Sequence, residues 1–222
     1  MTEASGRSAR EVQGARTRER ILKAARGTLA EHGPDGFTTR RVSQRAGVSH
    51  GMVHYHFKDK RDLILAVLVQ ARRDWIEPLE ELVDGPGSAE ARMRSVIAWI
   101  AQPATSDVMR VHLSIFVFSL ADDTVRERYA AEYARWRAPF VTLYRQLARE
   151  LGLEGLDAKS VGEAFASAAD GLVQQQVIDP DLPTARMLRR LFEATVARAP
   201  GGPQSRPRSR PRSRPSSRPS SR

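Results

Sequence analysis

The chain has 222 residues, of which 41% are hydrophobic, 28% charged and 6% aromatic, as in a globular protein with one or two cores. It contains no cysteine, which excludes disulfides, thiolate metal sites, iron–sulfur clusters and cysteine nucleophiles. No apolar run approaches the ~20 residues of a membrane span, and the first residues lack the apolar segment of a secretory signal. We therefore expect a soluble protein of the cytoplasm.

The net charge of +10 is concentrated in two parts of the chain. Residues 16–61 hold 11 basic and 4 acidic residues, a net of +7, and residues 201–222 hold 7 arginines and no acid. Residues 62–200, with 16 basic and 20 acidic residues, are mildly acidic. A localised basic block is typical of a nucleic-acid-binding module, although charges clustered by chance on a solvated surface explain it equally well.

Helical signals recur along most of the chain and no strand-like alternation appears, so we expect an all-α protein of about nine helices. Residues 1–15 lack apolar periodicity and are interpreted as a flexible arm. Residues 200–222 are interpreted as a disordered tail, because Gly, Pro, Gln, Ser and Arg supply nothing to bury. Between these ends we place a small helical domain at 16–62 and a larger one at 63–199.

The small domain begins with an amphipathic helix that we expect to start at Thr17 as its N-cap. Its apolar stripe is formed by residues at helical spacing: Ile21, Leu22, Ala25 and Leu29. Gly33 and Pro34 should end this helix, since glycine suits the position just past the last turn and proline cannot continue a helix.

Two short helices follow. Thr38 is expected to cap a helix over residues 39–46, which Gly47 stops. Ser49 is expected to cap a third helix that reaches Phe57. This succession of helix, short turn with glycine and helix is the helix-turn-helix plan. Each of the two helices has only about two turns, so the first helix must pack across both of them to bury a core.

The remaining segments indicate six more helices. The fourth helix should start near Asp59, with Asp62 in a capping-box-like relation, and Pro78 should kink or end it. Further helical patterns cover residues 93–100, 106–120, 122–152, 157–172 and 187–195. Pro139 should kink the longest of these helices.

One stretch, residues 37–63, reads FTTRRVSQRAGVSHGMVHYHFKDKRDL. It closely resembles the DNA-binding signature of the tetracycline-repressor (TetR) family of transcription regulators. The matching positions are Thr38, Thr39, Val42, Ala46, Gly47, Val48, Ser49, Gly51, Val53, Tyr55, His56, Phe57, Lys60 and Leu63. The resemblance implies an N-terminal three-helix DNA-binding domain and a larger C-terminal helical domain for ligand binding and dimerisation.

In a helix-turn-helix, the second helix enters the major groove and presents its first residues to base edges. Gly51 lets the backbone approach DNA, His50 can hydrogen-bond to a base, and Met52 can contact a thymine methyl. By its position in the resemblance, Arg40 could reach a guanine edge. The residues expected to contact DNA are Thr38, Thr39, Arg40, Ser49, His50, Gly51, Met52, His54, Tyr55, His56 and Lys60.

Contacts to phosphate are expected from Thr38 or Thr39, near free N–H groups at a helix start, and from the side chains around Tyr55. Tyr55 and His56 could instead be packing residues, and Met52 could be incidental. Many relatives carry an aromatic residue where His54 stands.

A helix-turn-helix protein usually binds a palindromic operator as a two-fold dimer, and the resemblance implies that the last two helices form the dimer surface. The residues assigned to this surface are small or apolar: Ala164, Ala168, Gly171, Leu172, Leu188, Leu191 and Phe192. Alternatively, these faces only complete the core of one chain.

The resemblance also implies a ligand pocket within the larger domain. The candidate lining residues are Trp99, Met109, His112, Phe116, Trp136, Phe140, Tyr144, Phe165 and Asp170. His112 and Asp170 are polar residues within apolar helices, which makes them candidate ligand anchors. They could equally be core residues that satisfy their own hydrogen bonds.

We therefore predict a sequence-specific, homodimeric repressor that binds double-stranded DNA and that an unknown small-molecule effector releases. An activator of the same fold, or a sequence-unspecific DNA-binding protein, remains the alternative. No catalytic motif appears, so we predict no enzyme, no cofactor and no membrane partner. His50 and His54 could hold a metal, but no third ligand accompanies them, so we predict no metal site. The arginine-rich tail could add salt-dependent affinity for DNA phosphates.

Overall fold

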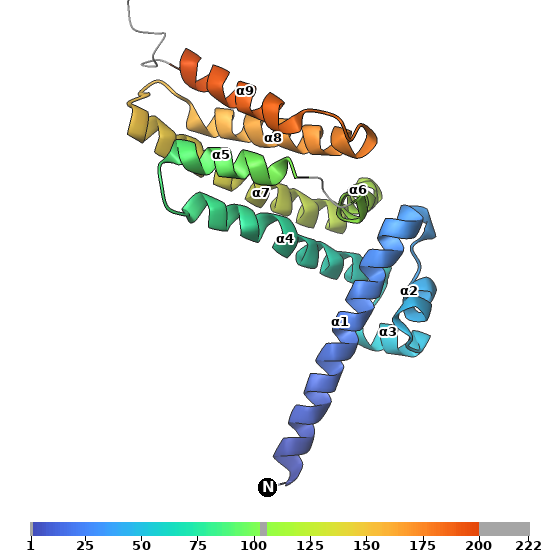
Figure 1. Ribbon diagram of the computed structural model, residues 1–222. Coiled ribbons are helices and arrows are strands. Elements are labelled where there is room, and N and C mark those ends of the chain that lie inside the picture. Colours follow the sequence, from blue (N-terminus) through green and yellow to red (C-terminus); the bar gives the residue numbers. More distant parts are fainter. Residues whose placement is uncertain (1, 103–105, 200–222) are drawn as a thin grey trace, which may run out of the picture.

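The computed structural model describes residues 2–102 and 106–199. Every regular element in these ranges is an α-helix, which confirms the expected class. The helices are α1 (Thr2–Gly36), α2 (Thr39–Ala46), α3 (His50–His56), α4 (Lys60–Asp84), α5 (Ala89–Ile100), α6 (Ser106–Ala121), α7 (Asp123–Leu151), α8 (Ala158–Ile178) and α9 (Thr184–Arg198) (Figure 1). None of the helices in these ranges is long and apolar enough to cross a bilayer. The predicted disordered tail, residues 200–222, lies outside the described residues.

The first helix differs from its prediction. It begins at Thr2 rather than at Thr17, so residues 2–15 of the expected flexible arm are helical. Thr17 does not cap the helix, because its hydroxyl donates to the carbonyl oxygen of Gln13, one turn earlier, at 3.0 Å. Figure 1 shows the N-terminal part of α1 projecting away from the other helices. The expected break at Gly33 is present, with φ 63° and ψ −170° in an otherwise continuous helix.

The helix-turn-helix has the predicted boundaries, and local capping explains them. The hydroxyl of Thr38 accepts from the N–H of Arg41 at 3.2 Å, which starts α2. Gly47 adopts φ 62° and ψ 39°, a left-handed conformation that suits glycine and ends α2. The hydroxyl of Ser49 then accepts from the N–H of Met52 at 3.2 Å and starts α3.

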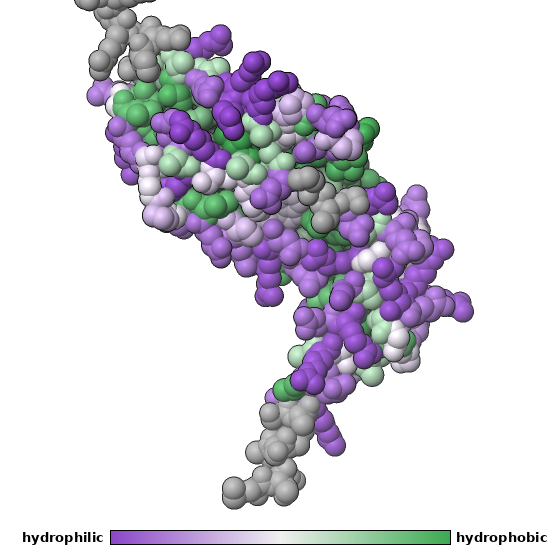
Figure 2. Space-filling model, viewed as in Figure 1, coloured by the Kyte–Doolittle hydropathy of each residue, from purple (hydrophilic) through white to green (hydrophobic). Residues whose placement is uncertain are grey.

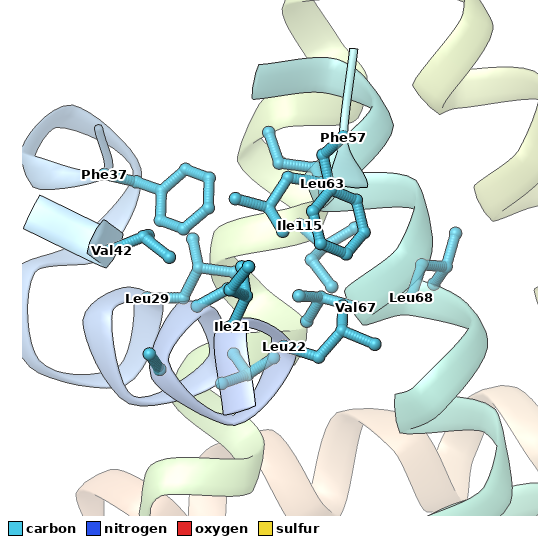
Figure 3. Close-up of a cluster of buried hydrophobic side chains, with 14 of the residues drawn as sticks. Ile21, Leu22, Leu29, Phe37, Val42, Phe57, Leu63, Val67, Leu68 and Ile115 are labelled. Atoms are coloured by element: carbon cyan, nitrogen blue, oxygen red, sulfur yellow. The ribbon is translucent and has the colours of Figure 1, made fainter. Parts of the chain in front are cut away.

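Two hydrophobic clusters divide the molecule. The first holds the inward residues of α1, α2, α3 and the beginning of α4, including Phe37, Val42, Val53 and Phe57, each at most 2% exposed. Helix α6 completes this cluster with Val111 and Ile115, so the first three helices do not close the core alone. Figure 3 shows the side chain of Ile115 beside Phe57 and Leu63.

The second cluster joins α5, α7, α8 and α9 to the later part of α4. At its centre, Phe140, Tyr144 and Phe165 are almost fully buried. Pro78 does not end α4, which continues to Asp84, and α7 likewise continues past Pro139. On the face shown in Figure 2, hydrophilic residues dominate around α1 to α3, whereas apolar and hydrophilic residues are interspersed over the other half of the molecule.

An ion pair joins the start of α4 to the start of α7. The Nε atom of Arg61 lies 2.6 Å from Oδ2 of Asp122, and Oδ1 of Asp122 accepts from the N–H of Val125. The bond from Val125 and the pairing with Arg61 hold the pKa of Asp122 below its ordinary value. One carboxylate therefore caps α7 and ties it to the half of the molecule that contains the helix-turn-helix.

We predict that Asp122→Asn lowers stability in a pH-dependent way. Asparagine keeps the helix cap but removes the charge that pairs with Arg61. Because folding lowers the pKa of Asp122, its stabilisation is present above the ordinary carboxyl pKa and is lost as the pH falls through the lowered value. The melting temperatures of wild type and variant should differ near neutral pH and converge in acid, and a difference that persists in acid would contradict this. The control Asp123→Asn removes a neighbouring carboxylate that pairs only within α7, with Arg126.

Close packing of α7 against α8 depends on Gly162. A Cβ atom at this position would lie 2.7 Å from both the Cα and the N of Val141. We predict that Gly162→Ala lowers the free energy of unfolding by about 1–3 kcal/mol, since backbone must move to admit the methyl group. Gly14→Ala is the matched control, because a Cβ at Gly14 meets nothing within 4 Å. Equal unfolding midpoints for the two variants in denaturant titrations would refute the close approach.

Candidate nucleic-acid interface and ligand cavity

Helix α3 is anchored on one side and open on the other. Val53 and Phe57 fix it in the first cluster, with exposed fractions of 0% and 2%. On the opposite side Tyr55 is 81% exposed and Met52 is 40% exposed. The predicted DNA contacts His50, Gly51 and His54 are also exposed, whereas His56 is half-buried. The face of α3 that solvent reaches is therefore rich in side chains able to bind bases or phosphates.

The histidines of α3 contact one another and α2. Nε2 of His50 lies 3.0 Å from the hydroxyl of Thr39 and 3.3 Å from Nε2 of His54. This contact ties the start of α3 to the start of α2, where Thr38 and Arg40 are exposed. The structure thus brings the predicted residues of both helices onto one surface. No group of three or more His, Cys, Asp or Glu able to hold a metal occurs among residues 2–102 and 106–199.

Lys60 is exposed at the start of α4, and its side chain also contacts two aromatic rings. Its Nζ lies 4.5 Å from the ring centroid of Phe118 on α6 and 5.9 Å from that of Phe37. Desolvation of the ammonium group beside these rings lowers the pKa of Lys60. The ammonium group therefore stabilises the contact between α4 and α6 through cation–π interactions.

Basic residues of α1 flank the two short helices, which motif matching did not single out. The guanidinium of Arg18 lies 5.0 Å from the ring centroid of Phe57, and Arg20 donates to the carbonyl of Gly47 at 3.5 Å. Arg45 pairs with Glu31. The charge count of residues 16–61 indicated a basic block, but only the packing of α1 shows that its arginines meet the turn between α2 and α3.

A cavity opens between α4, α6, α7 and α8. The empty space within it, including open solvent at its mouth, is about 640 Å³. Its lining is mostly apolar and aromatic: Leu68, Ala71, Trp75, Ile76, Met109, His112, Tyr129, Glu132, Tyr133, Trp136, Asp170 and Val173. A mostly apolar and aromatic lining with a few polar groups is typical of a site for a small organic molecule.

Only some of the predicted pocket residues line this cavity. Met109, His112, Trp136 and Asp170 do, and Phe116 lines a neighbouring hollow that shares Trp136 and Asp170 with it. The structure places Phe140, Tyr144 and Phe165 in the core instead, because their rings pack on one another where α7 meets α8. Trp99 packs edge to face on Trp75, behind the cavity wall.

Sequence reasoning missed the contribution of α4 and most of that of α7. Aromatic residues recur at helical spacing along α7, at Tyr129, Tyr133 and Trp136. This stripe, of which only Trp136 was predicted to line the pocket, was the signal that could have indicated the two tyrosines. Trp75 comes from α4, which links the two halves of the molecule and was not considered as a wall.

A polar network crosses the cavity wall. Nε2 of His112 lies 2.9 Å from the hydroxyl of Tyr129 and 3.4 Å from that of Tyr133. Tyr133 and Gln174 both donate to Oδ2 of Asp170, at 3.1 and 2.8 Å. Burial lowers the pKa of His112, against the opposing charge of Asp170, and burial raises the pKa of Tyr133 to about 12. Near neutral pH, His112 is therefore uncharged and Tyr133 keeps its proton.

The predicted dimer residues separate into two groups. Leu188 and Phe192 are 0% and 3% exposed and belong to the second cluster, so they cannot form a surface. Leu172 packs against the same cluster. The small residues Ala164, Ala168 and Gly171 remain accessible on α8, and Leu191 is 40% exposed on α9.

Two family models match the chain. One, described as bacterial regulatory proteins of the tetR family, matches residues 21–67. The other, described as the C-terminal part of a BetI-type transcriptional repressor, matches residues 89–200. A similar curated relative is the HTH-type transcriptional repressor AcnR of Corynebacterium diphtheriae, which is 36% identical over 112 residues, 50% of this chain and 55% of the relative. The chain thus spans about half the length of such curated relatives.

Solved structures share the fold. A putative transcriptional regulator from Pseudomonas aeruginosa PAO1 aligns over 81% of this chain and 88% of its own, with 23% identity and a TM-score of 0.73. A putative regulator from Saccharomonospora viridis, solved in complex with choline, covers 81% and 95%, with 21% identity and a TM-score of 0.67. The BetI-type model alone matches half of this chain, and the tetR model matches its helix-turn-helix. The chain belongs to the tetR family of bacterial regulatory proteins.

Proposed function

We propose that this protein is a homodimeric transcriptional repressor that leaves its operator when a small organic molecule fills the cavity. The observation that carries the proposal is the open face of α3, where Tyr55 is 81% exposed while Val53 and Phe57 are buried beneath it. A buried anchor with an exposed polar and aromatic face suits a reading helix in the major groove.

Residues from two helices supply the proposed DNA contacts. His50, Gly51 and Met52 on α3 are positioned for base edges, and His54 and Tyr55 for the phosphates beside the groove. Thr38 and Arg40 at the start of α2 extend the same surface. Arg20 of α1, which reaches the turn at Gly47, is a candidate phosphate contact that the structure adds.

Two copies of the helix-turn-helix, here called the reading head (α2 and α3), are needed to recognise a specific DNA site, because one short helix covers few base pairs. We assign the contact between copies to the accessible small residues of α8, Ala164, Ala168 and Gly171, with Leu191 of α9. Met187, which is 42% exposed on α9, adds apolar area to this surface. Small residues let helices approach closely, which suits a four-helix bundle made of two helices from each chain.

The cavity and the DNA-binding half are linked through α6. His112 lines the cavity, while its neighbour Val111 and the more distant Ile115 belong to the first hydrophobic cluster. A ligand that fits the cavity in only one arrangement of α6 stabilises that arrangement. Because α6 also packs against the helix-turn-helix, the ligand thereby shifts the equilibrium between different positions of the helix-turn-helix.

We predict that Tyr55→Ala weakens operator binding by roughly tenfold or more, the effect of losing a contact worth about 1.4 kcal/mol. The exposed ring contributes nothing to either core, so the melting temperature should not change. The assay is fluorescence anisotropy on DNA that the wild-type protein selects from a random library, with random competitor in excess. Leu151→Ala, an exposed apolar truncation at the end of α7, is the control. The proposed role of α3 fails if random competitor displaces the selected DNA equally from both proteins.

We predict that Gly171→Arg converts the dimer into monomers while each chain stays folded. A Cβ at Gly171 meets nothing within 4 Å in its own chain, so a larger side chain disturbs only a neighbouring copy. Sedimentation velocity measures the oligomeric state, and circular dichroism checks the helices. The control is Arg94→Gly on α5, which exchanges arginine and glycine in the opposite direction, at a position away from this surface. A wild-type protein that sediments as a monomer, or a variant that remains dimeric, would remove α8 from the interface.

A further inference from the structure

The charged groups of the cavity wall are all of one sign. Among the described residues that line it, Asp170 and Glu132 are acidic, and neither lysine nor arginine is present. The remaining titratable residues are His112, whose pKa burial lowers, and two tyrosines that burial keeps protonated. The described lining therefore holds two carboxyl groups and no basic side chain, although Arg135 outside the lining pairs with Glu132.

Asp170 has one oxygen to spare. Its Oδ2 accepts from Tyr133 and Gln174, both neutral donors, which fix the carboxylate without cancelling its charge. Its Oδ1 lies 3.9 Å from Nε2 of His112, too far for a hydrogen bond. This oxygen remains available to a ligand in the cavity.

Glu132 also keeps an oxygen without a partner. Its side chain is 16% exposed, and Oε1 accepts from Arg135 at 2.8 Å. Its Oε2 is buried and has no hydrogen-bond partner within the described part of the chain. Glu132 lines the cavity, so a positively charged group or a hydrogen-bond donor bound there lies close to its carboxylate.

Aromatic rings supply the rest of the recognition. Trp75 and Trp136 meet edge to face with centroids 6.4 Å apart, and Tyr129 and Tyr133 do so at 5.0 Å. All four line the cavity together with Leu68, Met109 and other apolar residues. The negative faces of such rings attract cations that carry little hydration, and their bodies bind apolar groups.

We propose that the effector is an organic cation, a charged nitrogen carried on an apolar body, with Asp170 as its counter-ion and Glu132 as a second acidic contact. This inference rests on the proposed function and specifies the ligand class of the same cavity. An anionic ligand would meet two like charges with no basic residue on the wall. A neutral apolar ligand would fill the space but form no ion pair with Asp170. Arg137 lines the neighbouring hollow, which shares Tyr133, Trp136 and Asp170 with the main cavity, and is not among the residues that line the main cavity.

The test compares two probes of the same shape, phenyltrimethylammonium and tert-butylbenzene, which differ by a nitrogen cation in place of a quaternary carbon. Quenching of the fluorescence of Trp75 and Trp136 reports binding to the full chain in the absence of DNA. We expect the cation to bind at least roughly tenfold more tightly than its neutral isostere, as an ion pair within an aromatic wall contributes a factor of this size.

Substitutions of the two acidic residues test which carboxylate binds the cation. Asp170→Asn should weaken binding of the cation by roughly tenfold, while leaving the affinity for tert-butylbenzene unchanged. Glu132→Gln should cause a smaller loss of the same kind. Glu154→Gln, an exposed acid outside the cavity, is the matched control and should have no effect. Melting temperatures check that each variant is folded, and Glu132→Gln remains informative if Asp170→Asn proves unstable.

The proposal is overturned if the cation does not bind, if the two probes bind equally, or if neither acidic substitution weakens binding of the cation. None of these measurements uses DNA, so they can fail while the protein still binds its selected operator. Conversely, a protein that binds the cation but no specific DNA would refute the proposed function and leave the ligand class standing.

Discussion

Helix α6 belongs to two hydrophobic cores at once, and the arrangement of the two halves depends on this sharing. Its Val111 and Ile115 complete the core beneath the helix-turn-helix, while Met109, two residues before Val111, packs into the second core. The hydroxyl of Ser114 donates to the carbonyl of Leu29 on α1, within this shared region. Because protein cores are packed as densely as organic crystals, α6 cannot move without moving residues on both sides.

This constraint connects the cavity to the reading head. Tyr129 of α7 belongs to the first cluster and also lines the cavity, where it contacts His112 of α6. Lys60 and Arg61 at the start of α4 hold the same end of α6 and α7 through Phe118 and Asp122. A ligand in the cavity therefore contacts residues that also position the DNA-binding half. Its effect on that half can pass directly through these residues. The effect of the ligand on DNA binding cannot exceed the difference in the ligand's binding free energy between the two arrangements of α6.

Local rules explain why the helix-turn-helix was predictable in detail. The caps at Thr38 and Ser49 and the left-handed turn at Gly47 each act within four residues, so the sequence alone carries them. The start of α1 was missed because the absence of apolar periodicity argues against burial and not against a helix. Periodicity likewise showed that Phe140 and Phe165 face inward but not what they face, and only the packing of α7 on α8 places them in the core. Lys60 matched the family signature, but its cation–π contact with Phe118, far along the chain, could not be predicted from local sequence.

Filling the cavity should change how the protein binds DNA, because the cavity and the helix-turn-helix share the residues of α6. The most direct measurement follows two signals in one titration, using any compound that quenches Trp75 and Trp136 and a labelled DNA that the protein has selected. Tryptophan fluorescence reports occupancy of the cavity, and anisotropy of the DNA reports its binding. The account predicts that the DNA is released over the concentration range in which the cavity fills. A filled cavity with unchanged DNA affinity would contradict it.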